Sequence, residues 1–385
     1  MLIRDYAFDK FSIQVHDTIF STELKADWDK LSVSGFPLNP DYLGALERAE
    51  PKDLSFRYLL IRDGNEIVAR IYFQILHFGR QNLSVDGNSI GQKFAALAVR
   101  LIPFKIIVAG NLFAVDSCPL YYLPEKISAG HILHILDEYT KAEKFDVFVL
   151  KDFPVEFTPE LTRPYGLNTF ESDMTMELTL HPSWSAFQDY EKSLTHKYAQ
   201  RARKIRKSGS VIERRVLDDG QLEEHKNRIA ELFREICSKQ TLRMGIIDEK
   251  YFLALNTCCK DRFRITGYFL ENKMIAFSTT LAQKETLEVH YIGIDYSYNK
   301  SHSLYFNILF DGVEQAILQG YKKLELGRTA REAKAVVGCQ PVYFNDYMLI
   351  RNRITRRIIS VIQDYFQKKM GDSWKERHPF KTHQA

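Results

Sequence analysis

The chain has 385 residues, more than one hydrophobic core usually serves, so two domains of under about 200 residues each are expected. Hydrophobic residues make up 45% and charged residues 26%, which is the balance of a folded protein and excludes extensive disorder. The formal net charge of +4 is small for this length, so the total charge does not indicate a DNA-binding protein.

The sequence contains no clear secretory signal and no clear disulfide or zinc-binding pattern. The five cysteines are odd in number and contain no C-x-x-C pair, so neither a disulfide framework nor a zinc site is indicated. Met1 to Lys10 lacks the apolar core of a secretory signal, so we expect a cytoplasmic protein with reduced thiols. The apolar stretch from Phe94 to Val115 is interrupted by Arg100 and Lys105, which favours a buried helix and strand over a transmembrane segment.

The first half of the chain predicts a mixed order of strands and helices. The expected elements, in chain order, are a strand at Phe11 to His16, helices at Glu23 to Leu31 and Pro40 to Arg48, a hairpin of Phe56 to Ile61 and Ile67 to Leu76, a strand at Ile106 to Val108, a helix at Ala129 to Lys144 and a closing strand at Val147 to Leu150. The hairpin turns at Asp63-Gly64-Asn65, where Gly and Asn tolerate positive φ.

The second half repeats this order. The expected elements are a strand at Met174 to Leu180, helices from Ser183 and Ser193, a strand at Val211 to Val216, helices at Leu222 to Ser238 and Glu249 to Cys258, a hairpin of Arg264 to Leu270 and Met274 to Leu281, a strand at Leu287 to Ile294, a helix from Ser303 to Gln319 and a strand at Leu324 to Leu326. The sequence therefore predicts a duplicated α/β unit with mixed α+β sheets, divided into residues 1–172 and 173–385, the second part including a C-terminal helix.

This order of elements is similar to the GNAT acyltransferase fold, and its duplication resembles the FemAB-like peptidyltransferases and the related BioF2-like acetyltransferase domains. The segments that carry the resemblance are the basic helix Ser193 to Gly209, the run His290 to Asp295 followed by the helix from Ser303, and Leu324-Glu-Leu-Gly-Arg328 with Lys334 and Gly338. The resemblance covers Asp173 to Ile350, and the first half only through its element order.

The resemblance implies two GNAT-like lobes in tandem and an N-acyltransferase that moves an acyl group from an acyl-CoA-type thioester to an amine acceptor. The donor would be acetyl-CoA or a longer acyl-CoA, and Ile292 and Gly293 would lie at the junction that receives it. Tyr291 and Asp295 would contact the substrate. After Asp295 the sequence reads Tyr296-Ser-Tyr-Asn-Lys-Ser-His-Ser303, without the glycine-rich pyrophosphate loop of typical GNAT enzymes.

Candidate acid and base residues follow from strand periodicity. Glu288 and His290 share one face of their strand, with Tyr291 on the other, because strand side chains alternate. Either residue is a candidate general base for an acceptor amine, and the alternative is a solvated or satisfied polar strand face. Tyr343 is a candidate for protonating the leaving group, and Arg243 lies in a polar loop of the kind that lines an acceptor site.

Candidate donor-binding residues are cationic or sit at a helix start. Lys300, Ser301 and Ser303 precede the predicted helix, whose N-terminus would attract phosphates; the alternative is that the serines only cap it. Arg328 follows the last central strand, where the crevice of an α/β sheet opens, and Lys334 is a further anion candidate.

The roles of two basic helices and of a pair of histidines have more than one interpretation. The first helix carries Lys197, Arg201 and Lys204 at helical spacing, which fits a solvated face or contact with an anionic donor, RNA or lipid; the helix starting near Arg351 is similar. His131, His134 and Glu138 share a helix face, but no second ligand group accompanies them, and we expect no metal site.

Three functions fit the sequence. The first is N-acyl transfer from acyl-CoA to a small-molecule or peptidyl amine. The second is a FemAB-like peptidyltransferase that uses aminoacyl-tRNA, although the chain lacks the long charged helical hairpin that some members of that family insert. The third is a noncatalytic binding module that retains the GNAT fold. Sequence does not identify the oligomeric state.

Overall fold

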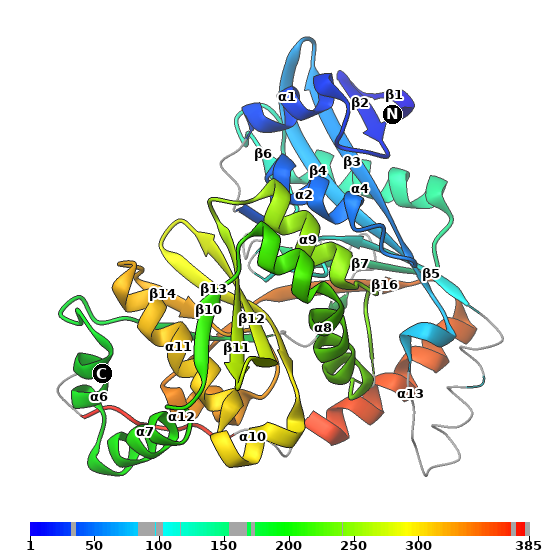
Figure 1. Ribbon diagram of the computed structural model, residues 1–385. Helices are drawn as coiled ribbons and strands as arrows, with labels where there is room; N and C mark the ends of the chain where they lie inside the picture. Colours follow the sequence, from blue (N-terminus) through cyan, green and yellow to red (C-terminus); the bar gives the residue numbers. More distant parts are fainter. Residues whose placement is uncertain are drawn as a thin grey trace. The chain divides into compact units, whose positions relative to one another are not determined.

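The structure is a computed structural model, and it describes residues 1–31, 36–83, 97, 103–115, 117–153, 168–170, 174–240, 242–370 and 375–381. The chain forms two compact units (Figure 1). The first contains Met1–Asp173, Gln240–Ala254 and Phe344–Lys368, and the second contains Met174–Lys239, Leu255–Tyr343 and Lys369–Ala385.

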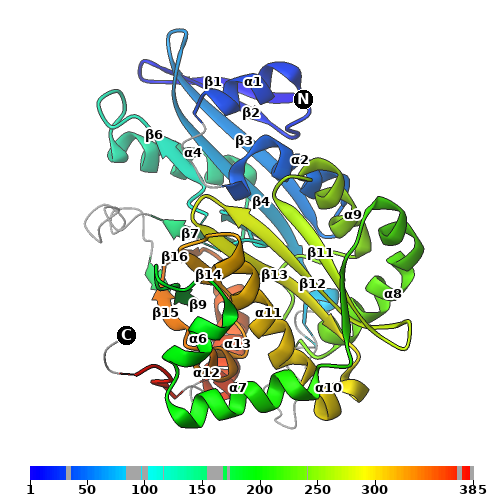
Figure 2. The same ribbon diagram turned by 60° about the vertical axis from the view of Figure 1, so that its left-hand side comes forward.

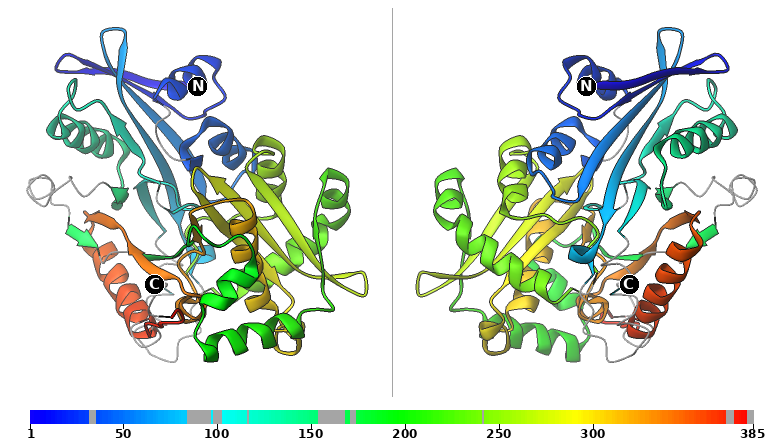
Figure 3. Two further views of the ribbon diagram at one scale, coloured as in Figure 1. Left: turned by 90° about the vertical axis from the view of Figure 1, so that its left-hand side faces the viewer. Right: turned by 90° about the vertical axis from the view of Figure 1, so that its right-hand side faces the viewer.

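The first unit is built on one mixed sheet. Its strands and helices are β1 (Leu2–Phe8), β2 (Phe11–His16), α1 (Thr22–Lys30), α2 (Pro40–Arg48), β3 (Leu54–Asp63), β4 (Glu66–Phe78), β5 (Phe104–Ala109), β6 (Leu120–Tyr122), α4 (Ala129–Glu143), β7 (Val147–Phe153), β8 (Asn168–Phe170), β16 (Asn345–Ile350) and α13 (Arg353–Met370). The sheet order is β1-β2-β3-β4-β5-β7-β16-β8, and β6 pairs with β4. Figure 3 shows the long β3–β4 hairpin in blue, with the β1–β2 hairpin beside it.

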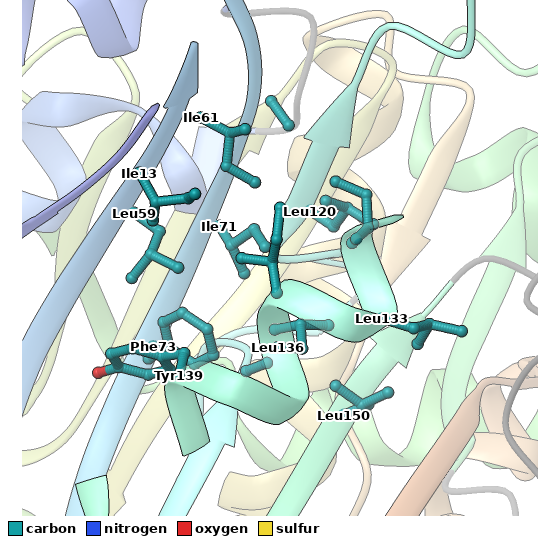
Figure 4. Close-up of a cluster of buried hydrophobic side chains, with 14 of the residues drawn as sticks. Ile13, Leu59, Ile61, Ile71, Phe73, Leu120, Leu133, Leu136, Tyr139 and Leu150 are labelled. Carbon is teal, nitrogen blue, oxygen red and sulfur yellow. The ribbon is translucent and has the colours of Figure 1, made fainter. Parts of the chain in front are cut away.

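Helix α4 covers one face of this sheet. Its apolar positions recur every three or four residues, and Leu133, Leu136 and Tyr139 pack against Phe73 and neighbouring strand residues in one buried cluster (Figure 4). The expected strand near Ile106 is therefore β5 of a covered sheet. The helix expected before it, from Phe94, lies outside the described residues apart from Leu97. No helix in the described ranges is long and apolar enough to cross a membrane.

The second unit has a seven-stranded sheet. Its elements are β9 (Met174–Thr179), α6 (Phe187–Ser193), α7 (His196–Ser208), β10 (Glu213–Val216), α8 (Asp219–Ser238), α9 (Glu249–Cys258, shared with the first unit through Ala254), β11 (Phe263–Leu270), β12 (Lys273–Gln283), β13 (Thr286–Ile294), α10 (Tyr296–His302), α11 (Leu304–Leu318), β14 (Lys323–Glu325), α12 (Arg331–Val337) and β15 (Gln340–Tyr343). The order is β10-β11-β12-β13-β14-β9-β15.

Helix α11 is the apolar centre of the second unit. Leu309 and Val313 are fully buried and pack in one cluster with Leu287 of β13, Leu324 of β14 and Tyr190 of α6. Figure 2 shows α11 lying along the strands of this sheet. Every described residue of α11 from Ile308 to Val313 is buried, which explains why its sequence reads as almost uniformly apolar.

The prediction of two α/β units with mixed sheets is confirmed, but the two units are not divided at one point in the sequence. The sequence analysis assigned residues 240–254 and 344–368 to the C-terminal lobe, whereas the structure groups both segments with the first unit. The physical reason for the second segment is β16, which pairs antiparallel with both β7 and β8 of the first sheet. The first segment is held by Asp53, whose carboxylate accepts a hydrogen bond from the backbone of Ile246 at 3.0 Å.

Candidate functional site

The pairing of strands β13 and β14 ends partway along the second sheet. Their parallel pairing runs from Thr286 opposite Lys323 to Glu288 opposite Glu325, and β14 ends there while β13 continues to Ile294. The edge of β13 beyond Glu288 therefore has no β14 residue beside it in the described pairing. An opening of this kind at the carboxyl ends of parallel strands is where α/β sheets bind ligands.

Two ionisable side chains meet at the start of this opening. Glu288 Oε1 and His290 Nδ1 are 2.5 Å apart, and Gln283 Nε2 donates to Glu288 Oε2 at 2.7 Å. The side chain of Glu288 is 6% exposed and that of His290 is 1% exposed. Because His290 as a whole is only partly buried, its exposed part is the main chain. The predicted shared face of Glu288 and His290 is thus a direct contact.

A second carboxyl group stands beside the first. Glu325 is buried, and its Oε1 accepts hydrogen bonds from the Thr175 hydroxyl and, at 2.5 Å, from the backbone N–H of Gly327. Its Oε2 is buried and has no hydrogen-bond partner among the described residues. Burial, with the neighbouring charge of Glu288 as the next contribution, raises the pKa of Glu325. One carboxyl of the pair therefore favours its protonated form.

Lys334 approaches the same cluster from α12. Its ammonium group is buried and donates to the carbonyl oxygen of Gly327 at 3.1 Å. Burial lowers the pKa of Lys334, and the carboxyl group of Glu325 partly offsets that effect. The structure therefore places Lys334 inside the sheet opening's polar core, whereas the sequence analysis considered it a donor-phosphate contact.

A β-bulge interrupts β13 next to Glu288. The pairing with β12 skips from Ile292 opposite Ser278 to Val289 opposite Thr280, so His290 and Tyr291 together face Thr279. The Thr279 hydroxyl accepts from the backbone N–H of Tyr291 at 2.8 Å. Strict alternation predicts Tyr291 on the face opposite His290, but the bulge breaks the alternation at these two residues.

The bulge brings the two rings together. The rings of His290 and Tyr291 lie edge to face with centroids 4.6 Å apart, and Tyr291 also meets Phe233 of α8 at 5.6 Å. Burial raises the pKa of the Tyr291 hydroxyl, and Glu288 adds to the rise. Tyr291 is therefore neutral and belongs to the buried wall of the site.

The end of β13 is packed tightly. A Cβ added to Gly293 would lie 2.1 Å from the Phe277 ring and 3.0 Å from the Leu232 side chain, so only glycine fits there. Ile292 packs on the apolar clusters of the unit. Both residues lie on the part of β13 that extends beyond β14, and their contact with a donor stays a prediction.

The predicted phosphate-binding helix start differs from the observed one. Lys300 and Ser301 lie within α10, a helix that the sequence analysis did not predict, and the Ser301 hydroxyl donates to the Tyr298 carbonyl. Ser303 has a left-handed backbone (φ 49°) between α10 and α11 and makes no capping hydrogen bond through its side chain. Asn299 Oδ1 accepts from the backbone N–H of Tyr305 at 2.9 Å. The first turn of α11 is therefore partly satisfied by a protein side chain.

Asp295 caps the preceding helix. Its carboxylate accepts from the backbone N–H of Ser297 at 3.2 Å, and Arg228 of α8 donates to it at 2.9 Å. Hydrogen bonds from Ser297 and the charge of Arg228 outweigh partial burial and lower the pKa of Asp295. A negative charge of the protein itself thus occupies the N-terminus of α10.

Arg328 lies in a basic pocket of about 850 Å³ beyond the end of β14. The pocket is lined by Lys197, Tyr198 and Arg201 of α7, Phe306 of α11, Arg328, Thr329 and Ala330 of the β14–α12 loop, Arg331, Glu332, Ala333 and Val336 of α12, and Arg377. Five of these side chains are basic and one is acidic. The one carboxylate, Glu332, forms an ion pair with Arg377.

Tyr343 and Arg243 are not among the residues of the carboxyl cluster. Tyr343 is at the end of β15, three strand spacings or about 14 Å across the sheet from β13, and its side chain is 57% exposed. The role of Tyr343 in protonating the leaving group stays a prediction, and its strand is not adjacent to β13 in the sheet. Arg243 belongs to the first unit, where its backbone N–H donates to the carbonyl of Asn82 at 2.8 Å.

Sequence reasoning missed Glu325, Thr175 and Gln283. Glu325 is the last residue of a three-residue strand and stands between Leu324 and Leu326, and a charged residue between two apolar positions of a short buried segment is a usable signal. Thr175 and Gln283 carry no signal of their own. Their roles depend on which strands neighbour one another, which the order of elements does not fix.

A second pocket in this unit, of about 390 Å³, is lined by acidic and basic side chains that form ion pairs with one another. Asp311 is buried and forms ion pairs with Arg206 and Arg214, and both arginines also bind Glu314. These contacts tie α7 and β10 to α11. In the part of the chain that the structure describes, no group of three or more His, Cys, Asp or Glu side chains could hold a metal ion.

No family model matches the chain, and no curated protein matches it by sequence. Solved structures do match. The crystal structure of FemX is similar with a TM-score of 0.52 at 12% identity, covering 89% of this chain and 98% of that one. A tandem GNAT protein from the clavulanic acid biosynthesis pathway is similar with a TM-score of 0.52 at 9% identity, covering 88% and 98%. At these identities the likeness concerns the fold, and the chain has the tandem GNAT fold.

Proposed function

We propose that the protein is an N-acyltransferase whose second unit transfers an acyl group from an acyl-CoA-type thioester to an amine. The observation that carries the proposal is the buried Glu288–His290 pair at the point where β13 and β14 separate. It combines a proton acceptor with an opening in the sheet, and acyl transfer to an amine needs both. The fold shared with FemX and with a tandem GNAT protein supports the same reaction class.

The donor's thioester is proposed to lie along β13 beyond Glu288. The main chain of this part of the strand is exposed at His290, and backbone N–H groups polarise a carbonyl toward attack. Gly293 and Ile292 would form the adjoining wall. The absence of a side chain at Gly293 leaves room for the Phe277 ring beside the strand.

The proposed reaction has one proton transfer and one exchange of bonds. The amine nitrogen attacks the thioester carbonyl carbon, a C–N bond forms, the C–S bond breaks and the sulfur leaves as the CoA thiolate. The attacking amine is neutral, and Glu288, directly or through His290, takes the one proton that its nitrogen gives up as the amide forms. With Nδ1–H donating to Glu288, the neutral imidazole carries its lone pair on Nε2 and can accept a proton while the carboxylate stabilises the imidazolium.

An activity assay tests the proposal. The purified protein is incubated with acetyl-CoA or a longer acyl-CoA and a panel of primary amines, including small peptides, and the released thiol is measured. We expect thiol release that depends on both the amine and the enzyme. Transfer from aminoacyl-tRNA without any thiol release from acyl-CoA would instead assign the FemAB-like peptidyltransferase reaction. Absence of transfer from both donors would leave a binding module.

A further inference from the structure

We infer that the basic pocket beside Arg328 binds the adenosine 3′,5′-bisphosphate end of CoA, in place of the helix start to which the sequence pointed. The inference rests on the proposed function, because it names the part of the donor that this pocket recognises. It is argued from three features: the partly occupied N-termini of α10 and α11, the charge of the pocket, and its position relative to the carboxyl cluster.

The two helix N-termini after β13 offer little to a phosphate. The N-terminus of α10 holds the carboxylate of Asp295, which also pairs with Arg228. At α11, the backbone N–H of Tyr305 already donates to Asn299. A pyrophosphate there would meet a fixed negative charge and an N–H group that is already bonded, so the phosphates of a donor need another partner.

The basic pocket supplies that partner. Its lining holds five basic side chains and one carboxylate, a formal charge of +4. Guanidinium groups bind phosphate oxygens in pairs, and three elements of the fold contribute them: Arg201 from α7, Arg331 from α12 and Arg328 from the loop between β14 and α12. The carboxylate of Glu332 is paired with Arg377, so it does not oppose an incoming anion.

The pocket also offers a surface for a planar ring. The Arg201 guanidinium lies 4.9 Å from the centroid of the Phe306 ring, and Tyr198, Ala333 and Val336 complete an apolar side. Phosphate-binding cations next to an aromatic and aliphatic wall match a nucleotide better than an inorganic anion. A volume of about 850 Å³ is large enough for a nucleotide.

The position of the pocket connects it with the proposed reaction centre. Arg328 follows Glu325 by three residues, and α12 carries Lys334 on the cluster side between the pocket residues Ala333 and Val336. Phe306 lies in the first turn of α11, which packs on β13 and β14. A donor with its nucleotide in this pocket would direct its thioester end toward the separation of the two strands.

The test is binding of adenosine 3′,5′-bisphosphate, measured by calorimetry, to the wild type and to variants. We expect saturable binding that weakens about tenfold or more in Arg201→Gln and in Arg331→Gln, because each loses a charge-assisted contact. Lys197→Gln should weaken binding less, because an ammonium group binds phosphate as a point charge and does not make the paired contacts of a guanidinium group. Lys204→Gln is the matched control, since Lys204 is exposed on the same helix outside the pocket lining, and it should bind like the wild type.

A second measurement separates this inference from the proposed function. S-acetylpantetheine lacks the nucleotide, so Arg201→Gln should raise the KM for acetyl-CoA about tenfold or more relative to the KM for S-acetylpantetheine, whereas Lys204→Gln should leave the turnover of both donors unchanged. Variant-sensitive binding of the nucleotide without acyl transfer to any amine would support the pocket and contradict the proposed function. Acyl transfer with equal acetyl-CoA KM in all variants would support the function and overturn the pocket. Binding of an RNA hairpin without binding of the nucleotide would also overturn it.

Discussion

Glu288 and Glu325 face each other directly across two parallel strands, and both side chains are buried. Burial raises the pKa of Glu325, and the repulsion between two carboxylates so placed adds to the rise. Thr175 and Gly327 fix Glu325, while Gln283 and His290 fix Glu288. The protonation of Glu325 therefore depends on the pairing of β13 with β14, which places Glu288 opposite it.

Replacing Glu325 by Gln should change how stability depends on pH. The pKa of Glu325 is raised above the ordinary value of 4.5, so its favourable contribution is complete below about pH 4.5 and is lost as the pH rises toward the raised pKa. Glu325→Gln cannot ionise, so its free energy of unfolding should increase relative to the wild type as the pH rises from about 5 to about 8. Urea unfolding at both pH values measures this. A difference independent of pH would mean that Glu325 is ionised in the folded protein.

Gly293→Ala should destabilise the second unit by about 1 to 3 kcal/mol, because the added methyl group overlaps the Phe277 ring. Gly220→Ala is the control: its nearest neighbour is Asp218 Oδ1 at 3.4 Å, and it lies in α8 of the same unit. The control should be neutral or stabilising by up to about 1 kcal/mol. Urea midpoints of the two variants make the comparison, and equal midpoints would show that β13 relaxes to admit a side chain.

Asp295→Ala should lower stability by about 0.5 to 2 kcal/mol through loss of the α10 cap and leave the donor KM within about twofold. The reason is that its carboxylate is already committed to Ser297 and Arg228. Thermal unfolding and steady-state kinetics of the same preparation give both values. A KM effect of about tenfold at unchanged stability would restore the substrate contact expected from the sequence resemblance.

Tyr343→Phe should change kcat by less than about twofold, because the phenol is exposed at the end of β15 and lies about 14 Å across the sheet from β13. Turnover at saturating acyl-CoA and amine tests this. A loss of about a hundredfold would show that Tyr343 protonates the leaving group after all, and would require the reaction centre to lie near β15.

Local patterns predicted most of the fold. The hairpin turn at Gly64 and the one at Asn272 fall where the sequence placed them, and both residues have positive φ (59° and 65°). Alternation along β13 predicted that Glu288 and His290 share a face, and the two side chains are in contact. Each of these features depends on residues that are close in the chain.

Features set by distant pairing were not predictable. β16 pairs with β7, about two hundred residues earlier, and the sequence from Asn345 to Ile350 does not indicate which strand it pairs with. The bulge at His290 and Tyr291 depends on the register with β12, and the role of Glu325 depends on its place opposite Glu288. The short helix α10 was missed because its polar residues lack an apolar stripe, and none of them is buried.

The central claim is that Glu288, with His290, accepts the proton of the amine, and the turnover number of Glu288→Gln at saturating acyl-CoA tests it most directly. We predict a kcat lower by about 10² to 10⁴-fold with a nearly unchanged donor KM, and a smaller loss in His290→Ala. Glu285→Gln, an exposed carboxylate at the turn before β13 that pairs with Lys322, serves as the control and should have wild-type turnover. Wild-type turnover in Glu288→Gln and in His290→Ala would contradict the account and place the reaction elsewhere.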